Sequence, residues 1–530
     1  MFLAEQSAAA VPAVFKQLAE SNEWARLLPE ICVAGLSLVV LINGMLLNKS
    51  ERWFTPAVVK FFLLLIAAFT STAIWLGKSD EAISFGGLVS QHGAYTDVLR
   101  LFFLLTAFAV THLGSVFLRA SKLAHNEFYH LVLVATAAMM LLVQSNHFVL
   151  FFVALETVAV TLYVLVGYNR NSAFSLEAGV KYLITGGLSS ALLLAGIVLL
   201  YGLGGNTALN PHAGLTDMLR FDHLQVFVTA HQDLVLVKAA VALVLAGVAF
   251  KIGAFPFNTW IPDVYQGAPS PVTAFLAIGS KAAGIFALIL LCVLENAPFY
   301  GIDSVLLHIL LPVTALTLLL GNISALSQIN VKRLMGLSGM SHAGFLLLGV
   351  VAAIAAPDEN ARFLAIASVV AYLFVYMFSS TIVFGVIGHV APEDDARGIT
   401  TDYNQLYRRN PVLGLLLAIG VGSLAGVPPT LGFLTKLLVL AAAFKSASFQ
   451  AANGSNGLFG VIAIALVCVA MGVFYYFSWL REAYDRNKTV DGTAPAPILV
   501  GVRSRIILSV FAVIVLFGFL FCGGFLPAIG

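Results

Sequence analysis

Residues 411–447 read PVLGLLLAIGVGSLAGVPPTLGFLTKLLVLAAAFKSA, and this stretch indicates how the whole chain folds. The run is almost entirely apolar and exceeds the roughly 20 residues that one helix needs to cross a membrane. Gly426-Val427-Pro428-Pro429 interrupts it, and proline breaks a helix because it has no backbone N–H to donate. Lys436 lies in the second half, where a charge is costly. We therefore predict a broken membrane helix that carries a buried lysine.

The composition extends this interpretation to the rest of the chain. Of its 530 residues, 60% are hydrophobic and only 10% are charged, whereas soluble proteins carry roughly 25% charged residues. In lipid, every backbone polar group must be paired within the protein, so only helices or closed barrels can span a membrane. The apolar runs are continuous rather than alternating, which favours helices. We predict an all-α polytopic membrane protein.

Apolar runs of suitable length predict about 14 membrane spans. They lie near residues 27–47, 57–76, 97–118, 128–146, 148–167, 179–203, 233–257, 270–294, 304–323, 338–356, 362–389, 411–447, 457–480 and 504–527. Ser145-Asn146-His147 forms a tight turn between the fourth and fifth spans. The seventh span contains Pro256, so we expect it to be broken, like the twelfth.

The distribution of lysine and arginine predicts the orientation, because these residues concentrate in cytoplasmic loops. Loops that follow odd-numbered spans hold Lys49, Arg52, Lys60, Arg119, Lys122, Arg170, Lys332, Arg333, Arg397, Arg408, Arg409, Arg481, Arg486, Lys488 and Arg503. Loops that follow even-numbered spans hold Lys78, Arg100, Arg220, Arg362 and Lys238. Both termini are therefore expected on the periplasmic side of a bacterial inner or other energy-transducing membrane.

Several chemistries are disfavoured. The four cysteines occur singly in apolar runs, and the chain has no Cys-x-x-Cys motif. This argues against an iron–sulfur cluster or zinc site, so we expect no metal and no redox cofactor on this chain. The net charge is only +2 and we find no basic stripe, so nucleic acid is not an expected partner.

Four charged residues lie well inside predicted spans, namely Glu156, Lys251, Lys281 and Lys436. Intramembrane charges are expensive and usually functional. The alternative is a set of structural ion pairs, but one central glutamate cannot neutralise three lysines. A lysine or glutamate removed from water favours its uncharged form, and an approaching opposite charge restores the charged form. Such residues suit proton transfer.

Three further polar residues in or near spans permit a structural interpretation. Lys181 lies near the start of the sixth span and can reach the cytoplasmic interface. His308 is better explained as a core or boundary histidine, and His342 is either a structural hydrogen-bond partner or part of the functional set.

The prolines provide a second feature expected of a proton path, namely backbone carbonyls without a helical partner. Pro256 frees the carbonyl of Ile252, next to Lys251, and Pro428 and Pro429 free those of Leu424 and Ala425. Paired interrupted helices in the two halves of a transporter mark its ion path. The two breaks are five spans apart, which fits two five-helix units at residues 128–294 and 304–480, flanked by segments 1–127 and 481–530.

The sequence resembles subunit N of complex I, the NADH–quinone oxidoreductase. The segment FKIGAFPFNTWIPDVYQGAPSPVTAFLAIGSKAAGIFAL is similar to that family's seventh-to-eighth-helix signature. Further similar blocks are FYHLVLVATAAMMLLVQSNHFVLFFVALETVAVTLYVLVGY, LEAGVKYLITGGLSSALLLAGIVLLYG, QINVKRLMGLSGMSHAGFLLLGV and AGVPPTLGFLTKLLVL. The likeness covers about residues 95–480, and PDVYQGAP is typical of subunit N rather than of its paralogues M and L.

The resemblance implies roles for individual residues and for partners. Glu156 matches the fifth-helix glutamate, Lys251 its seventh-helix lysine partner, Lys281 the central lysine and Lys436 the lysine that passes protons outward. Lys181 and His342 match auxiliary positions on the polar axis, and the two units are expected to be inverted and antiporter-like. FMN, iron–sulfur clusters and quinone belong to other subunits of such a complex, and other membrane-arm subunits, lipid, water and protons are the expected partners of this chain.

One residue departs from the family pattern, and three other functions stay open. Family members usually carry histidine where this chain has Asn258, so a titratable group at that point is in doubt.

A subunit of a multi-chain cation/proton antiporter would share the five-helix units without redox partners. A solute transporter would place substrate-specific polar groups at mid-membrane, and a scaffold would not need three buried lysines. The electron donor, whether NADH, ferredoxin or reduced deazaflavin, and the quinone are not specified by the sequence.

Overall fold

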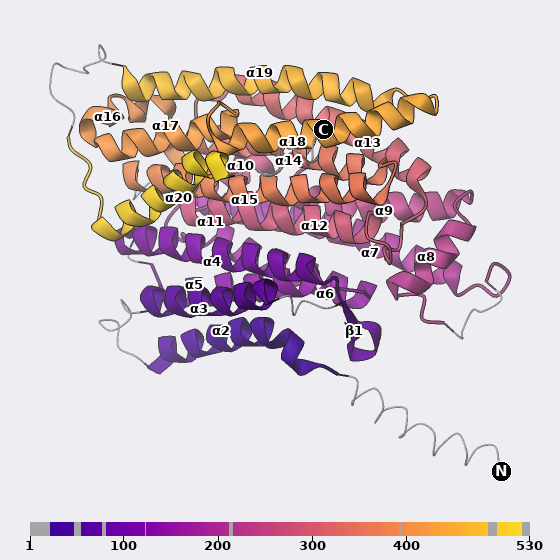
Figure 1. Cartoon of the computed structure of the whole chain (residues 1–530). Helices are drawn as coiled ribbons and strands as arrows, with labels where there is room; N and C mark the ends of the chain where they lie inside the picture. The colour runs from indigo at the N-terminus through magenta and orange to yellow at the C-terminus, as the bar shows by residue number, and fades with distance from the viewer. Residues whose placement is uncertain are drawn as a thin grey trace.

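The computed structural model describes residues 22–46, 55–76, 81–121, 123–210, 216–391, 395–485 and 496–521. These residues are nearly all helical, and the long helices run roughly side by side across the molecule (Figure 1). The predicted helical membrane class is confirmed. The chain termini, several loop cations and residues 522–527 of the last predicted span lie outside the described residues.

The long helices follow the predicted apolar runs. They are α2 (Leu28–Leu46), α3 (Thr55–Trp75), α4 (Ala94–Ser121), α5 (Asn126–Leu142), α6 (Phe148–Val166), α7 (Ala173–Gly204), α9 (Val235–Ile252), α12 (Lys281–Cys292), α13 (Asp303–Leu326), α14 (Val331–Ile354), α15 (Glu359–Val390), α17 (Pro411–Ala425), α18 (Leu431–Ala452), α19 (Gly457–Tyr484) and α20 (Val502–Phe521). A short helix, α11 (Ser270–Phe275), and a π-helical turn at Leu276–Ser280 run directly into α12. Twelve described helices are long and apolar enough to cross a membrane, while α5 and α17 are shorter apolar helices. The total of about 14 spans stays a prediction.

Both predicted helix breaks are present. Helix α9 ends at Ile252, and Gly253 adopts a left-handed φ of 76°, which glycine tolerates because it has no Cβ. The chain resumes helical structure in α10 (Ile261–Gly267), so Pro256 lies within the interruption. In the same way α17 ends at Ala425, Gly426 has a φ of 81°, and α18 begins at Leu431 beyond the two prolines.

The structure adds elements that the sequence did not predict. A surface helix, α8 (Phe221–Ala230), precedes α9. A short helix, α16 (Leu406–Arg409), precedes α17. Two three-residue strands, β1 (Ala82–Ser84) and β2 (Val89–Gln91), pair antiparallel between α3 and α4. The backbone of Ser90 donates to Gln144 just beyond α5, so the hairpin covers the turn that joins α5 to α6. The hairpin is a small addition to the predicted all-α membrane fold.

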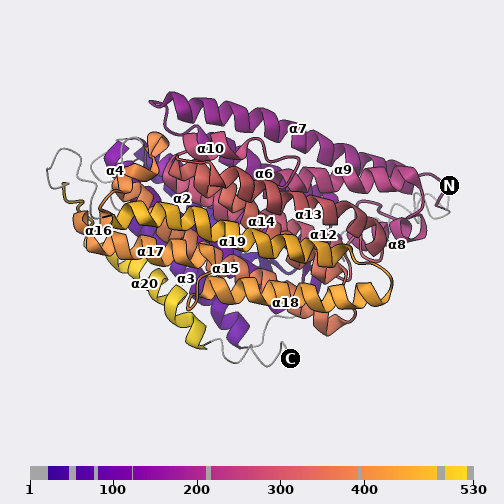
Figure 2. The same cartoon turned by 90° about the horizontal axis from the view of Figure 1, so that it is seen from above.

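Helices α12 and α14 form the centre of the bundle. The apolar stretches of Ser270–Cys292 and Val331–Ile354 are completely buried within this one chain. Helices α2, α3, α7 and α19 lie at the periphery, where they expose large apolar side chains, and Figure 2 shows α7 along one edge. Such an arrangement is expected where lipid rather than water is the surrounding solvent. The central helices carry two of the predicted site residues, Lys281 and His342.

A buried ion pair ties the N-terminal helices together. Arg100 Nε of α4 lies 2.6 Å from Glu30 Oε1 of α2, and Arg100 also pairs with Asp97 at 2.8 Å. Gln144 donates a 2.8 Å hydrogen bond to the same Glu30 oxygen. Because Arg100 lies inside α4, counting it among the loop cations was wrong. Lys60 of α3 and Arg119 of α4 also lie within helices rather than in loops, so the orientation inferred from the loop cations stays a prediction.

Candidate functional site

Glu156 on α6 and Lys251 on α9 face each other inside the bundle. The Lys251 Nζ lies 3.5 Å from Glu156 Oε1, and the two side chains are 5% and 22% exposed. The same glutamate oxygen accepts a 2.6 Å hydrogen bond from Ser190 Oγ on α7. The contact between the two predicted charges is therefore confirmed, and Ser190 holds the carboxylate in place.

Lys251 lies in the last turn of α9, directly before the helix break. Its Nζ makes no hydrogen bond to a described residue, so Glu156 is its main polar neighbour there. The break itself is anchored, since the Phe255 N–H donates a 3.0 Å hydrogen bond to Thr317 Oγ1 on α13. Lys251 thus has a counter-ion at a distance that small movements can change.

Lys281 begins α12, directly after the π-helical turn. Its Nζ donates a 2.5 Å hydrogen bond to the carbonyl oxygen of Gly339 on α14 and a 3.3 Å hydrogen bond to Tyr376 Oη on α15. The ammonium also lies 5.0 Å from the centre of the Tyr376 ring, within cation–π range. π-Helical turns are rare and often accompany functional sites. No described carboxylate pairs with Lys281, and its described polar contacts are with neutral groups.

Helix α12 also contacts the backbone of α9 at Lys251. It packs on α9, and a Cβ built at Gly284 would lie 3.4 Å from the Lys251 carbonyl carbon. Gly284 is three residues after Lys281, so the two positions share one helix face. Lys281 is therefore about one helical turn from the contact with Lys251.

His342 on α14 lies between two tyrosine hydroxyls. Its Nδ1 is 2.8 Å from Tyr372 Oη and its Nε2 is 3.2 Å from Tyr476 Oη. The imidazole centre is 4.9 Å from that of the Tyr376 ring, the same tyrosine that contacts Lys281. Both ring nitrogens are thus engaged, and the histidine adjoins the surroundings of Lys281.

Lys436 on α18 reaches back to the break between α17 and α18. Its Nζ donates hydrogen bonds of 2.8 Å and 3.0 Å to the carbonyls of Leu424 and Ala425. These are the two carbonyls that Pro428 and Pro429 were predicted to free. No described carboxylate pairs with Lys436. The broken helix supplies the polar surroundings of the lysine.

A small cavity joins His342 to Lys436. His342, Tyr376, Ser379, Ser423 and Lys436 are among the side chains that line it. Its volume of about 10 Å³ is room for roughly one water molecule. Lys281 therefore contacts Tyr376, the Tyr376 ring contacts His342, and His342 and Lys436 line one cavity.

Lys181 lies at the edge of the bundle, where its side chain is 43% exposed. It pairs with Asp263 of α10 at 2.6 Å and with Glu177 at 2.7 Å, and Asp263 also pairs with Arg333 of α14. Burial acts to raise the pKa of the Asp263 carboxyl, but the hydrogen bond and charge of Lys181, together with Arg333, hold it below the usual value. The cluster links α7, α10 and α14.

The remaining predicted positions have local roles in the structure. The Asn258 carbonyl accepts a 3.1 Å hydrogen bond from the N–H of Ile261, at the start of α10. His308 is exposed and pairs with the Ser304 carbonyl in its own helix, which agrees with a boundary histidine. Within the described ranges, no group of three or more His, Cys, Asp or Glu residues could hold a metal ion.

Sequence reasoning missed several contacts in the site. Asp263 stands in the quoted PDVYQGAP stretch, where an acid beside a broken helix could have been singled out. Ser190, Tyr372, Tyr376 and Tyr476 carry no such signal, because serine and tyrosine are ordinary in membrane helices. Only the packing of separate helices brings them to the charged residues.

Comparison with known proteins gives this geometry a family. The family model described as NADH:quinone oxidoreductase/Mrp antiporter, TM, matches residues 145–461. NADH-quinone oxidoreductase subunit N 1 of Opitutus terrae is 46% identical over 95% of this chain and 96% of its own length. The chain belongs to the NADH-quinone oxidoreductase subunit N family. The resemblance of the sequence to subunit N is thereby confirmed.

Solved structures agree with this placement in the subunit N family. A chain of respiratory complex I from Thermus thermophilus superposes with a TM-score of 0.73 at 28% identity, over 95% of this chain and 99% of that one. A chain of the Mrp complex from Dietzia also gives a TM-score of 0.73, over 95% and 96% of the two chains, but at 19% identity. The second likeness shows a shared fold alone.

Proposed function

We propose that this chain translocates protons as the membrane-arm subunit N of a complex I-type quinone oxidoreductase. It carries no redox centre of its own, and FMN, iron–sulfur clusters and quinone reside on other subunits. The identity to a subunit N relative over nearly the full chain supports the family part of the proposal. The single observation that supports the mechanism is the row of neighbouring residues from Lys281 to Lys436: Lys281 donates to Tyr376, the Tyr376 ring contacts His342, and His342 and Lys436 line one cavity.

Each buried charge has a distinct part in the proposed path. Glu156 controls the charge of Lys251, because the 3.5 Å contact stabilises the ammonium and its loss removes that stabilisation. Lys281 receives the proton at the centre, where its hydrogen-bond partners among the described residues are the Gly339 carbonyl and the Tyr376 hydroxyl. Lys436 passes the proton to the outside, and His342 with the water-sized cavity supplies the connection between the two lysines.

The broken helices fit this mechanism physically. Carbonyls left without helical partners are tolerated at membrane depth only when they are buried in protein or line a wet cavity. The carbonyls of Leu424 and Ala425 meet this condition by accepting hydrogen bonds from Lys436. Lys181 has an auxiliary role at the edge, where its pairing with Asp263 joins α7 to the broken segment α10.

The proposal includes an orientation and an internal arrangement. Residues 128–294 and 304–480 are two inverted antiporter-like units, each with one broken helix, between the flanking segments 1–127 and 481–530. Both termini are periplasmic in a bacterial inner membrane, since lysine and arginine concentrate in the odd-numbered loops. The partners are the other membrane-arm subunits, lipid, water and protons.

Purification of the complex from native membranes tests the function. An affinity tag on this chain should recover a large assembly that contains iron–sulfur clusters, FMN and quinone reductase activity, together with other antiporter-like subunits. The multi-chain cation/proton antiporter is the competing function, because the family model also covers Mrp antiporters. Recovery of an assembly without redox cofactors, active only in cation/proton exchange, would favour that competitor.

A further inference from the structure

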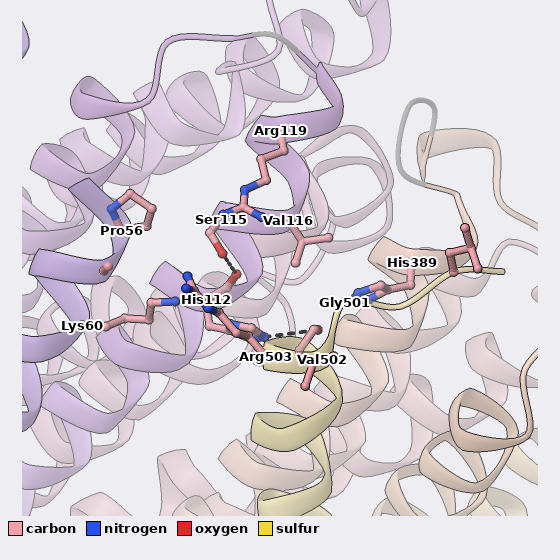
Figure 3. A pocket seen from close by; sticks show the side chains of 13 residues that line it. Pro56, Lys60, His112, Ser115, Val116, Arg119, His389, Gly501, Val502 and Arg503 are labelled. Carbon is pink, nitrogen blue, oxygen red and sulfur yellow. Dashed lines mark hydrogen bonds between the residues drawn. The ribbon is translucent and has the colours of Figure 1, made fainter. Parts of the chain in front are cut away.

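A second polar site lies apart from the row of buried lysines. It is a pocket of about 460 Å³ at the ends of α3, α4, α15 and α20 (Figure 3). Lys60, Arg119 and Arg503 line it, together with His112 and His389. No described carboxylate is among the lining residues. The pocket is therefore cationic and large enough for a small ligand group.

The cations of this pocket pair with no carboxylate in the part of the chain that the structure describes. Lys60, Arg119 and Arg503 form no ion pair with a described residue, whereas Lys181 and Arg333 elsewhere in the chain do. His112 is only 2% exposed, and its Nε2 lies 3.2 Å from Ser504 Oγ while its Nδ1 has no described partner. Like charges held together without compensation favour an external anion.

The pocket lies at one membrane surface. Lys60 is in the second turn of α3, Arg119 in the last turn of α4, His389 in the last turn of α15 and Arg503 at the start of α20. All four positions adjoin odd-numbered loops, which the orientation proposed above places in the cytoplasm. The cytoplasmic leaflet carries acidic lipids, and basic pockets between membrane helices on that side bind phosphate-containing headgroups.

Apolar side chains continue below the cations. Helix α3 packs on α4, α4 on α15 and α15 on α20, so the pocket lies along a row of four helices. Leu64, one turn deeper than Lys60, is 47% exposed. On α20, Ile506 and Val510 follow Arg503 by one and two turns and are 57% and 50% exposed. Positive charge at the surface above exposed aliphatic groups matches a phospholipid better than a free anion.

We propose that this pocket binds the phosphate group of an acidic phospholipid from the cytoplasmic leaflet. Lys60, Arg119 and Arg503 contact the phosphate oxygens, and the acyl chains lie against the exposed apolar faces of α3 and α20. The inference uses the orientation proposed above, but it needs no assumption about proton transfer.

Photocrosslinking in the intact complex tests the proposal. The purified complex is placed in nanodiscs of phosphatidylglycerol or of phosphatidylcholine, each doped with a headgroup-labelled photoactivatable lipid of the same class, and crosslinked peptides are mapped. Peptides containing Lys60 or Arg503 should be labelled in the acidic discs at least tenfold more than in the zwitterionic discs. Millimolar inorganic phosphate should leave this labelling unchanged.

Matched variants make the test specific. Lys60→Gln with Arg503→Gln should reduce labelling about 25-fold, since each cation near an acidic surface contributes roughly fivefold. Lys60→Arg with Arg503→Lys, which retains both charges, should label normally, and so should Arg505→Gln, an exposed cation on α20 outside the pocket. Equal labelling in both kinds of disc, or undiminished labelling in the double Gln variant, would overturn the proposal. Displacement by free phosphate, or a neighbouring polypeptide found in the pocket, would overturn it as well.

Discussion

Lys436 Nζ donates a 2.8 Å hydrogen bond to the carbonyl oxygen of Leu424, which is 12 residues earlier in the chain. The Leu424 carbonyl is free to accept this bond because Pro428, four residues later, has no backbone N–H to donate to it. Gly426 completes the arrangement, as a Cβ at that position would lie 2.9 Å from Lys436 Cδ. The helix break thus provides a carbonyl that accepts a hydrogen bond from the buried ammonium. The ammonium also lies beside a water-sized cavity.

Replacing Lys436 tests whether this charge titrates during turnover. Lys436→Met keeps the length of the side chain and removes the charge, so the complex should assemble while proton pumping falls at least tenfold. Lys445→Met, on the exposed face of the same helix, is the matched control and should pump normally. Pumping is measured by dye quenching in proteoliposomes, and a normal rate for Lys436→Met would make this lysine structural.

Gly339→Ala probes the position of the Lys281 ammonium without removing it. The added Cβ would lie 2.9 Å from Lys281 Nζ, so the flexible end of the lysine must move off the Gly339 carbonyl. Because alanine favours helices, folding should be retained while pumping falls several-fold. Gly187→Ala, where a Cβ meets nothing within 4 Å, should leave both unchanged. If Gly339→Ala pumped like the control, the carbonyl contact would be irrelevant to turnover.

The Glu30–Arg100 pair should behave differently, because it lies outside the proton path. Glu30→Leu removes one of the two carboxylates that pair with the buried Arg100 guanidinium. Loss of one partner of a buried ion pair costs roughly 3–5 kcal/mol of stability. The yield of assembled complex should drop, while the pumping rate per assembled complex stays normal. Quantitative native gels with activity staining separate the two quantities, and a lower specific rate would bring Glu30 into the mechanism.

Much of the fold could be predicted because lipid imposes long apolar runs and makes interruptions visible. Pro256 and the Pro428-Pro429 pair marked both broken helices, and simple counting back along the helix identified the Leu424 and Ala425 carbonyls. The helix α8 and the β1–β2 hairpin were missed, since short surface elements carry no comparable constraint from the membrane.

The site was predictable only in its charged members. Glu156 and Lys251 stood out because charge at membrane depth is rare. Their pairing was expected from the family resemblance rather than from their spacing in the sequence, and the structure places the two groups 3.5 Å apart. Ser190 and Tyr376 could not be found, as they gain significance only from neighbours on other helices. Arg100 was wrongly counted as a loop residue. Its burial depends on an ion pair with Glu30 on another helix, which the sequence does not reveal.

Topology is checked by reporter fusions. A reporter that is active only in the periplasm should give a signal when it is fused after Gly530. A reporter that is active only in the cytoplasm should give a signal when it is inserted in the 390–409 loop. This outcome follows from the concentration of lysine and arginine in odd-numbered loops. The opposite pattern at either site would overturn the orientation, and with it the leaflet assigned to the lipid pocket.

The central claim is that Glu156 and Lys251 work as one unit. At 3.5 Å and an effective dielectric of ~20, two unit charges interact by roughly 5 kcal/mol, so losing either should disable the other. Glu156→Gln and Lys251→Met should each reduce pumping strongly, and Glu156→Asp should retain part of it, because it keeps the charge but shortens the reach.

The double variant is the most direct measurement. Proton pumping per electron transferred is compared in proteoliposomes for the wild type, both single variants and Glu156→Gln with Lys251→Met. Members of one unit are non-additive, so the double variant should pump within about twofold of the weaker single variant. Losses that multiply, with the double variant reduced by the product of the two single effects, would show independent residues and contradict the account.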